Sequence, residues 1–199
     1  IRDETGVTLS DLNLGGGYGV RYTQEDEAID IPARLAELAA YLKEETERLG
    51  LPMPRFLMEP GRSIVADAGM TLYTVGSVKR IPGYKQYAAV DGGMTDNPRY
   101  ALYQSRYTVY HAHKSGSMER FDVVGRCCES GDIIQPGVEL PGDTCRGDIL
   151  AVCTTGAYNY SMASNYNRLP RPAVVMLTPD RIYEAVRRET FADLTALDL

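Results

Sequence analysis

The segment NLGGGYG, residues 13 to 19, places four glycines in five consecutive positions. Glycine sacrifices backbone stability, so such a cluster indicates that something must approach the main chain closely. A phosphate or another anion bound by peptide N–H groups is the usual ligand of such a loop. The cluster therefore predicts an anion site at Gly15, Gly16 and Gly17. A tight structural turn without a ligand is the alternative.

A second candidate loop is EPGR, formed by Glu59, Pro60, Gly61 and Arg62, which follows the short apolar run 56–58. Loops that follow the strands of a parallel sheet or barrel carry its binding groups. A guanidinium suits a carboxylate because two parallel N–H groups match two oxygens. The loop therefore predicts a carboxylate-binding arginine, with a structural Glu–Arg ion pair as the alternative.

Thiol chemistry is indicated by the adjacent residues Cys127, Cys128 and Glu129. A thiol has a free pKa of about 8.5 that responds to its neighbours, so it is a plausible proton donor. No cysteine pair has C-x-x-C spacing, which argues against structural zinc and favours free thiols in a reducing compartment. The HAH segment, residues 111–113, has the spacing of a strand chelate, but we predict no metal.

The first part of the chain alternates strand and helix. Residues 8–14 predict a short strand, and residues 31–49 have the apolar spacing of a helix. Asp30 is its expected N-cap, and Gly50 fits the position after its end. The run 56–58 predicts the next strand. This is the βαβ rhythm of a parallel sheet or barrel, which we assign to residues 1–73.

The pattern changes around residue 70, where the β-rich run 70–81 begins, and we place the domain boundary near Tyr73, which assigns residues 74–199 to the second domain. Short strands parted by Gly, Pro and Asp follow one another with no convincing helix, which predicts an antiparallel β-sandwich or barrel. The stretch 172–186 predicts either a hairpin or a strand followed by a helix. Residues 190–197 predict a short terminal helix. The fold class is therefore α/β followed by all-β.

Charge and hydropathy exclude two classes of partner. The net charge is −6 and no basic block occurs, which argues against nucleic acid. No apolar run approaches the roughly 20 residues of a membrane span. The first residue is Ile1, and the start resembles neither a signal peptide nor a methionine start, so we expect the chain to begin within a longer protein.

Five motifs in order carry a resemblance: GGGYG (15–19), EPGR (59–62), DGGMTDNPRYALY (91–103), GRCCESGD (125–132) and GAYNYSMASNYN (156–167). Together they resemble the C-terminal half of the diaminopimelate decarboxylases, pyridoxal-phosphate enzymes with the alanine-racemase-like fold. The resemblance implies the C-terminal part of a (β/α)₈ barrel followed by a β-sandwich domain. About 70 residues are available against about 250 for a complete barrel. The family's Schiff-base lysine and its cofactor-stacking histidine find no match here. The isolated chain is therefore expected to be an inactive fragment.

The resemblance also implies residue roles. The cofactor pyridoxal 5′-phosphate would be bound by Gly15, Gly16, Gly17, Glu59, Pro60, Gly61, Arg62 and Tyr158. The amino-acid substrate would be bound by Arg62, Arg99, Tyr103, Glu129 and Tyr158. Cys128 would be the proton donor after decarboxylation. In the family, the cysteine and glutamate cross a dimer interface, which implies a homodimer with shared active sites. The family usually has proline where Tyr100 stands, which leaves the aim of Arg99 open.

The resemblance implies conversion of meso-2,6-diaminopimelate to L-lysine and carbon dioxide in the cytoplasm. A related decarboxylase acting on ornithine, arginine or carboxynorspermidine is the nearest alternative. Ornithine-type relatives have aspartate after the cysteine, whereas Glu129 stands here. A third possibility from another class is a non-catalytic binding or dimerisation fragment.

Overall fold

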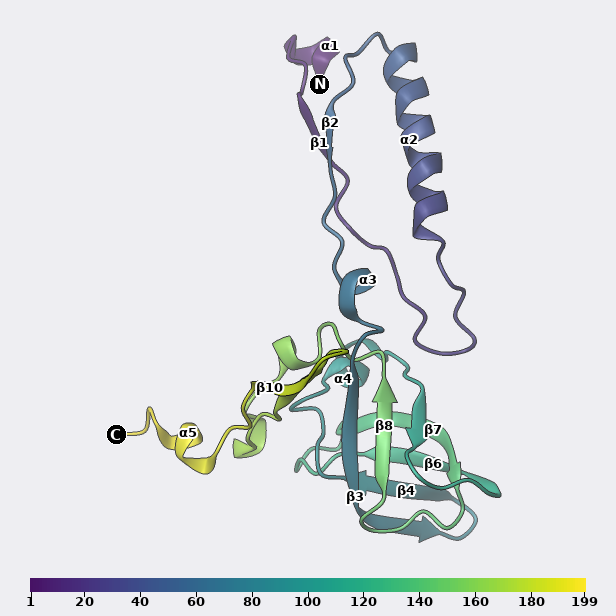
Figure 1. The fold of residues 1–199 in the computed structure, drawn as a ribbon, viewed down its shortest axis with the longest axis vertical. Coiled ribbons are helices and arrows are strands. Elements are labelled where there is room, and N and C mark those ends of the chain that lie inside the picture. Colours follow the sequence, from purple (N-terminus) through teal and green to yellow (C-terminus); the bar gives the residue numbers. More distant parts are fainter. The chain divides into compact units, whose positions relative to one another are not determined.

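The structure, a computed structural model, describes all 199 residues and contains two compact units, Ile1–Val65 and Ala66–Leu199 (Figure 1). The boundary near residue 73 predicted from the sequence lies inside strand β3 (Met70–Ile81), whereas the two units divide between Val65 and Ala66. None of the helices has the length and apolarity to cross a membrane. All four cysteines are unpaired, as expected from their spacing.

The first unit is a βαβ unit with two further short helices. Its elements are α1 (Arg2–Thr5), β1 (Asp11–Asn13), α2 (Ile31–Arg48), β2 (Arg55–Leu57) and α3 (Arg62–Val65). Strands β1 and β2 are parallel, with Leu12 opposite Phe56. The side chain of Asp30 accepts a hydrogen bond from the Ala33 N–H at 3.0 Å, and Gly50 has a φ of 58° just beyond the helix. The predicted start and end of α2 are thus confirmed.

A cavity of about 340 Å³ lies in the first unit beside α1, β1 and α2. It is lined mainly by apolar side chains, among them Val7, Leu12, Leu42 and Leu51. None of the residues predicted to bind cofactor or substrate lines it. The candidate chemistry of this unit therefore lies elsewhere, in the loops that follow β1 and β2.

The second unit is built around a six-stranded sheet. The strands are β3, β4 (Lys85–Val90), β5 (Val109–His111), β6 (Met118–Val124), β7 (Ile133–Pro141) and β8 (Ile149–Cys153), in the order β5-β8-β3-β4-β6-β7. All neighbouring pairs are antiparallel except β4 and β6, which are parallel. The predicted β-domain is therefore confirmed, but its sheet is mixed and not antiparallel throughout. The connection from β4 to β6 includes α4 (Arg99–Tyr103), and a long crossover of this kind is what a parallel pair requires.

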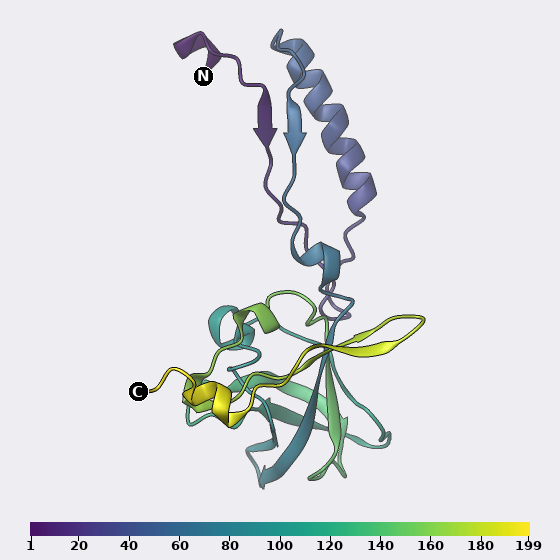
Figure 2. The same ribbon diagram turned by 60° about the vertical axis from the view of Figure 1, so that its left-hand side comes forward.

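The core of the second unit lies inside the curved sheet. Its largest fully buried apolar side chains are Phe121, Ile134, Leu140, Leu150, Val75, Val123 and Val152. The two ends of the strand order, β5 and β7, also approach each other. Just before β5, the Tyr107 N–H donates to the Gln135 side chain at 2.9 Å. The sheet consequently curls towards a closed barrel, as Figure 2 shows.

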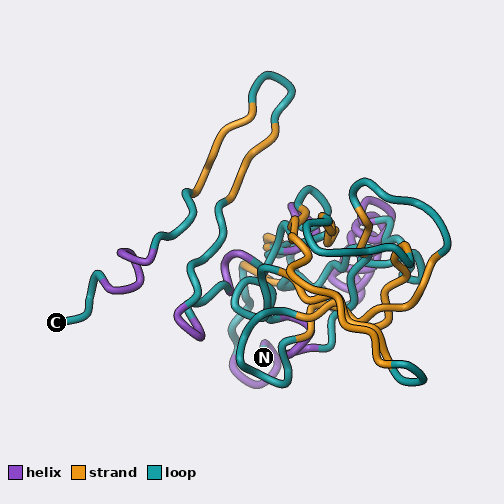
Figure 3. Tube along the Cα trace, turned by 90° about the horizontal axis from the view of Figure 1, so that it is seen from below, coloured by secondary structure: helices purple, strands orange, loops and turns teal.

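The C-terminal part leaves this sheet. Two short 3₁₀ turns, η1 (Tyr160–Met162) and η2 (Tyr166–Arg168), precede a separate hairpin of β9 (Val174–Leu177) and β10 (Ile182–Val186), which Figure 3 shows as two adjacent orange segments. Helix α5 (Phe191–Thr195) begins with a capping box between Thr190 and Asp193. The hairpin interpretation is therefore confirmed over the helical one, and the terminal helix is confirmed.

Candidate active site

The glycine loop after β1 needs its glycines for two different reasons. Gly15 and Gly17 have φ values of 69° and 88°, a region that side chains disfavour. At Gly16 a Cβ atom would lie 2.1 Å from the carbonyl oxygen of Glu59, so close packing of two main chains requires glycine there. The atoms that approach the main chain at Gly16 belong to the EPGR loop, and the anion expected at these glycines stays a prediction.

Hydrogen bonds join the glycine loop to the EPGR loop. Asn13 donates through Nδ2 to the Glu59 carboxylate at 2.5 Å and accepts from the Gly15 N–H at 2.7 Å. The Glu59 N–H donates to the Gly15 carbonyl at 2.7 Å. Within the first unit the N–H groups of Gly16 and Gly17 have no such acceptor. These two N–H groups are therefore able to bind an anion. Sequence reasoning overlooked the role of Asn13, and only its place two residues before the first glycine hints at that role.

Arg62 stands at the first position of α3, beyond the Pro60-Gly61 bend. Its guanidinium carbon lies 5.9 Å from the centre of the Tyr22 ring, within the range of a cation–π contact. The first unit thus contains two N–H groups that are able to bind an anion, and a guanidinium at the end of the neighbouring loop.

In the second unit, two of the other predicted substrate residues lie beside Arg99. Its guanidinium carbon lies 5.2 Å from the centre of the Tyr103 ring and 5.6 Å from that of Tyr158. The Tyr103 contact follows from the i,i+4 spacing on α4. Tyr158 reaches the cluster from the loop after β8, with a φ of 65° that is rare for a residue with a side chain.

The charge of Arg99 is buried and has no anionic partner. The residue is only 6% exposed, and its Nε has no hydrogen-bond partner. Besides the two tyrosine rings, its guanidinium makes one side-chain hydrogen bond, a long one of 3.5 Å to the Ser105 hydroxyl, and it forms no ion pair with a carboxylate. Burying a cation without an anion is costly. The arrangement is therefore suited to an anionic ligand such as a carboxylate.

The turn between β6 and β7 carries the two adjacent thiols in different environments. Cys127 is half-buried, and burial, followed by the nearby Asp132 charge, raises its pKa to about 11. Cys128 is exposed, and its N–H donates to the Asn167 side chain at 2.8 Å. Cys128 is therefore the more accessible of the two thiols.

Glu129, the next residue, is held as a carboxylate. It accepts hydrogen bonds from the Gly131 N–H at 3.3 Å and from the Tyr166 hydroxyl at 3.2 Å. Both hydrogen bonds lower the pKa of Glu129, and the one from the Gly131 N–H has the larger effect. An ionised, exposed carboxylate beside an accessible thiol is able to bind an ammonium group.

Asp132 organises the loops around this turn, and sequence reasoning missed it. One of its oxygens accepts from the Met94 N–H and the other from the Cys127 N–H, both at 2.6 Å. A Cβ atom at Gly93 or Gly125 would lie 2.6 Å or 2.2 Å from these oxygens. The buried Asp132 thus links the loop before α4, which leads to Arg99, to the loop that carries Cys128.

The HAH segment is occupied by local contacts. The Nδ1 of His111 accepts from the N–H groups of His113 and Lys114, at 3.2 and 2.9 Å. Its Nε2 lies 3.1 Å from the Asp148 carboxylate, and the His111 side chain is only 3% exposed. Both ring nitrogens of His111 therefore already lie beside partners within the protein.

The family model for the C-terminal sheet domain of pyridoxal-dependent decarboxylases matches residues 18–156. The chain belongs to this decarboxylase family. It is 48% identical over 200 residues to the diaminopimelate decarboxylase of Bacillus subtilis, and the match covers 100% of this chain and 45% of that protein. This decarboxylase chain thus spans about half the length of the curated relatives that it matches.

Solved structures agree with this assignment. The diaminopimelate decarboxylase of M. jannaschii in complex with L-lysine is 33% identical, with a TM-score of 0.87 over 100% of this chain and 45% of that one. A lysine/ornithine decarboxylase from Vibrio vulnificus with cadaverine is 28% identical, with a TM-score of 0.72 over 85% of this chain and 44% of that one. The decarboxylase chain therefore fits the diaminopimelate enzyme over more of its length.

Gly16→Ala is expected to weaken cofactor binding by the full-length decarboxylase at least tenfold. The added Cβ would lie 2.1 Å from the Glu59 carbonyl oxygen, so the glycine loop and the EPGR loop must separate. The N–H groups of the glycine loop then no longer have the orientation that binds the phosphate. Titration with pyridoxal phosphate, followed by absorbance, measures the effect. Gly19→Ala is the control, because its Cβ would meet only the end of the Ile29 side chain, at 3.3 Å. Equal affinities for the two variants would contradict a role for the contact between these loops.

Proposed function

We propose that this chain is the C-terminal portion of a pyridoxal-phosphate decarboxylase that converts meso-2,6-diaminopimelate to L-lysine and carbon dioxide. The observation that carries the proposal is the buried guanidinium of Arg99, which lies between Tyr103 and Tyr158 with no anionic partner. A substrate carboxylate supplies the missing negative charge. The identity to diaminopimelate decarboxylases over the whole chain supports the choice of substrate.

The first unit fits the phosphate group of the cofactor. The N–H groups of Gly16 and Gly17 have no acceptor within this unit, and Gly15 turns the chain so that they are presented together. Glu59, Pro60 and Gly61 form the adjoining wall, and Arg62 and Tyr158 bind both cofactor and substrate. When bound, the cofactor supplies an electron sink for loss of the α-carboxylate.

The other side chains divide the recognition of substrate between them. Arg62, Arg99 and Tyr103 bind carboxylate oxygens, and two parallel N–H groups of a guanidinium fit such a group. Glu129, whose pKa is lowered, binds the ammonium group at the distal end. The Cys128 thiol then donates a proton from Sγ to the α-carbon of the product. Its exposure favours it over Cys127, whose pKa is raised.

We further propose that the complete enzyme is a cytoplasmic homodimer. Residues 1–73 would be the last part of a (β/α)₈ barrel, and residues 74–199 the β-domain. The two-stranded sheet of the first unit supports this, because its strands leave apolar side chains such as Leu12 and Leu57 exposed. In this arrangement Cys128 and Glu129 serve the active site of the other subunit. The Schiff-base lysine would lie outside the chain, so the chain alone is expected to be inactive.

Cys128→Ala is expected to lower kcat of the complete polypeptide at least a hundredfold, as loss of a general acid does. Formation of lysine and carbon dioxide from meso-diaminopimelate measures this. Cys127→Ala is the matched control and should change kcat by less than about threefold, since that thiol is half-buried and lies beside Asp132. Unchanged turnover of Cys128→Ala would remove the thiol from the mechanism.

The same assay separates the alternatives. Turnover of ornithine, arginine or carboxynorspermidine in preference to diaminopimelate would support a related decarboxylase. A complete polypeptide that acts on none of these substrates would support a non-catalytic binding or dimerisation role.

A further inference from the structure

Glu129 receives one contact from a distant part of the chain. Its Oε1 accepts from its immediate neighbours, the Ser130 hydroxyl and the Gly131 N–H, both at 3.3 Å. Its Oε2 accepts from the hydroxyl of Tyr166, which lies 37 residues later, at 3.2 Å. Tyr166 is therefore the side chain that ties the orientation of this carboxylate to the rest of the unit.

Tyr166 belongs to a short, strained turn. It begins η2, in which Asn167 and Arg168 have φ values of 58° and 55°. Residues with side chains rarely adopt this region, so surrounding contacts must hold them there. The Asn167 side chain accepts from the Cys128 N–H at 2.8 Å. Two successive residues of η2 thus contact Cys128 and Glu129, two successive residues of the turn between β6 and β7.

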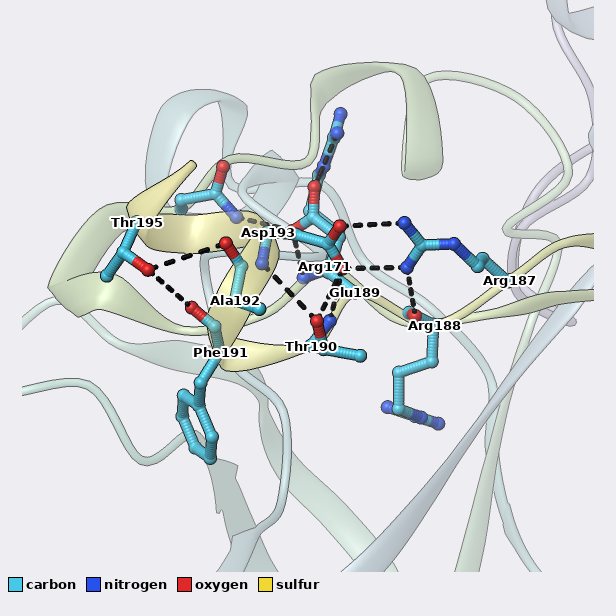
Figure 4. Close-up of polar contacts among 10 residues, drawn as sticks. Arg171, Arg187, Arg188, Glu189, Thr190, Phe191, Ala192, Asp193 and Thr195 are labelled. Carbon is cyan, nitrogen blue, oxygen red and sulfur yellow. Dashed lines mark hydrogen bonds and ion pairs between the residues drawn. The ribbon is translucent and has the colours of Figure 1, made fainter. Parts of the chain in front are cut away.

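The contacts that hold η2 come from the C-terminal segment. Asn165, directly before η2, donates through Nδ2 to the Glu189 carboxylate at 2.6 Å and to the Leu169 carbonyl at 3.1 Å. Glu189 also accepts from the N–H and the Nε of Arg171, at 2.8 and 2.7 Å (Figure 4). The hydrogen bond from the Arg171 side chain, followed by the one from the Arg171 N–H, lowers the pKa of Glu189 to about 2. Glu189 consequently remains an ionised acceptor at neutral pH.

We propose that Tyr166 is a specificity-determining residue, which orients Glu129 towards the distal ammonium group of the substrate, and that Glu189 is a positioning residue, which acts on Glu129 through Asn165 and Tyr166. The proposal rests on the proposed function, because it concerns recognition of a substrate with a distal amine. It assigns to the C-terminal segment beyond β10 a role in the chemistry of a turn about 60 residues earlier in the chain.

A neighbouring ion pair in the same segment provides a matched control. Arg187 binds Asp193 through two hydrogen bonds of 2.7 Å, and Asp193 also caps α5 with Thr190 (Figure 4). Neither partner contacts Asn165 or Tyr166. Disruption of this pair therefore loosens α5, and with it the hydrogen bond of 2.7 Å from Arg168 of η2 to the Leu194 carbonyl, while the hydrogen bond between Asn165 and Glu189 stays in place.

Tyr166→Phe in the complete enzyme is expected to raise KM for meso-diaminopimelate about tenfold and to change kcat by less than threefold, because a hydrogen bond to a charged group is lost from the binding step. Since the Tyr166 hydroxyl lowers the pKa of Glu129, its loss raises that pKa. The rise in KM on acidification should then begin at a higher pH than in the wild type. Tyr110→Phe, on an exposed position of β5, should alter neither quantity.

Glu189→Gln tests the route to Tyr166. We expect a rise in KM of about fivefold with kcat nearly unchanged, and the Tyr166→Phe/Glu189→Gln double variant should match Tyr166→Phe alone. Asp193→Asn should lower the thermal midpoint and leave KM unchanged. Independent, multiplying effects of Tyr166→Phe and Glu189→Gln, or an equal rise in KM for Asp193→Asn, would overturn the positioning role of Glu189.

The wild-type enzyme distinguishes failure of this inference from failure of the proposed function. Wild-type decarboxylation of diaminopimelate together with an unchanged KM for Tyr166→Phe would refute the inference alone. A folded wild-type enzyme that does not act on diaminopimelate would refute the proposed function and the inference with it.

Discussion

Asp132→Asn is expected to destabilise the second unit by about 3 kcal/mol. Each carboxylate oxygen of Asp132 accepts one main-chain N–H, from Met94 and from Cys127, both at 2.6 Å. An asparagine side chain has only one accepting oxygen, so its NH₂ group must face one of these N–H donors. The residue is only 4% exposed, and water cannot readily replace the lost acceptor.

Thermal unfolding measures this loss, which for a cooperative unit of roughly 150 residues corresponds to a midpoint lower by about 6 to 12 °C. Asp180→Asn, in the exposed turn of the C-terminal hairpin, is the control and should leave the midpoint within about 1 °C. Decarboxylation should also fall, because the Cys127 N–H places the turn that carries Cys128. A midpoint equal to that of the control would mean that Asp132 does not hold the two loops together.

Local chemistry explains the parts of the fold that the sequence predicted. Helix α2 has an apolar period, an Asp30 N-cap and a glycine after its end, and each signal acts within a few residues. Strand β3 spans Met70–Ile81, the same residues as the β-rich run identified by composition. The C-terminal hairpin was also foreseen, although the apolar spacing of Ile182 and Val186 left a helix open.

Features that depend on contacts between distant residues could not be predicted from the sequence. The parallel pairing of β4 with β6 depends on a connection that includes α4 and β5, and no pattern within either strand encodes it. Helix α4 is five residues long, too short for its period to stand out. The sequence around Asp132 does not show that its carboxylate turns inward, because the N–H groups that it accepts lie up to 38 residues away.

In the candidate site, too, contacts between residues close in sequence could be predicted, whereas contacts between distant residues could not. The i,i+4 spacing of Arg99 and Tyr103 brings them together on α4 once the helix is known. The meeting of Tyr158 with Arg99 followed only from the family resemblance, since β8 and the strained loop after it place that ring. Tyr166 lies in the motif GAYNYSMASNYN, but it contacts Glu129 from a turn with positive φ values at Asn167 and Arg168, and only the asparagine is a residue type that favours such values.

Arg99→Met is expected to lower kcat/KM for diaminopimelate about a thousandfold without destabilising the protein. A thousandfold loss corresponds to about 4 kcal/mol of transition-state stabilisation, which is reasonable for a buried guanidinium that binds a carboxylate. Without substrate, the Arg99 cation is buried with no anion, so an apolar side chain of similar length should be tolerated. Loss of the two cation–π contacts, about 1 kcal/mol each, offsets part of that relief.

Arg80→Met is the matched control, because its guanidinium carbon also lies over an aromatic ring, 5.5 Å from the centre of Phe121. Arg80 is exposed on β3 and donates a hydrogen bond of 2.6 Å to the Gly142 carbonyl, so its loss should lower the thermal midpoint slightly and leave activity unchanged. Steady-state kinetics and thermal unfolding of both variants test the contrast. If Arg99→Met instead lost stability and retained activity, the cation would be a structural group packed between two tyrosines, and the substrate carboxylate would have to bind elsewhere.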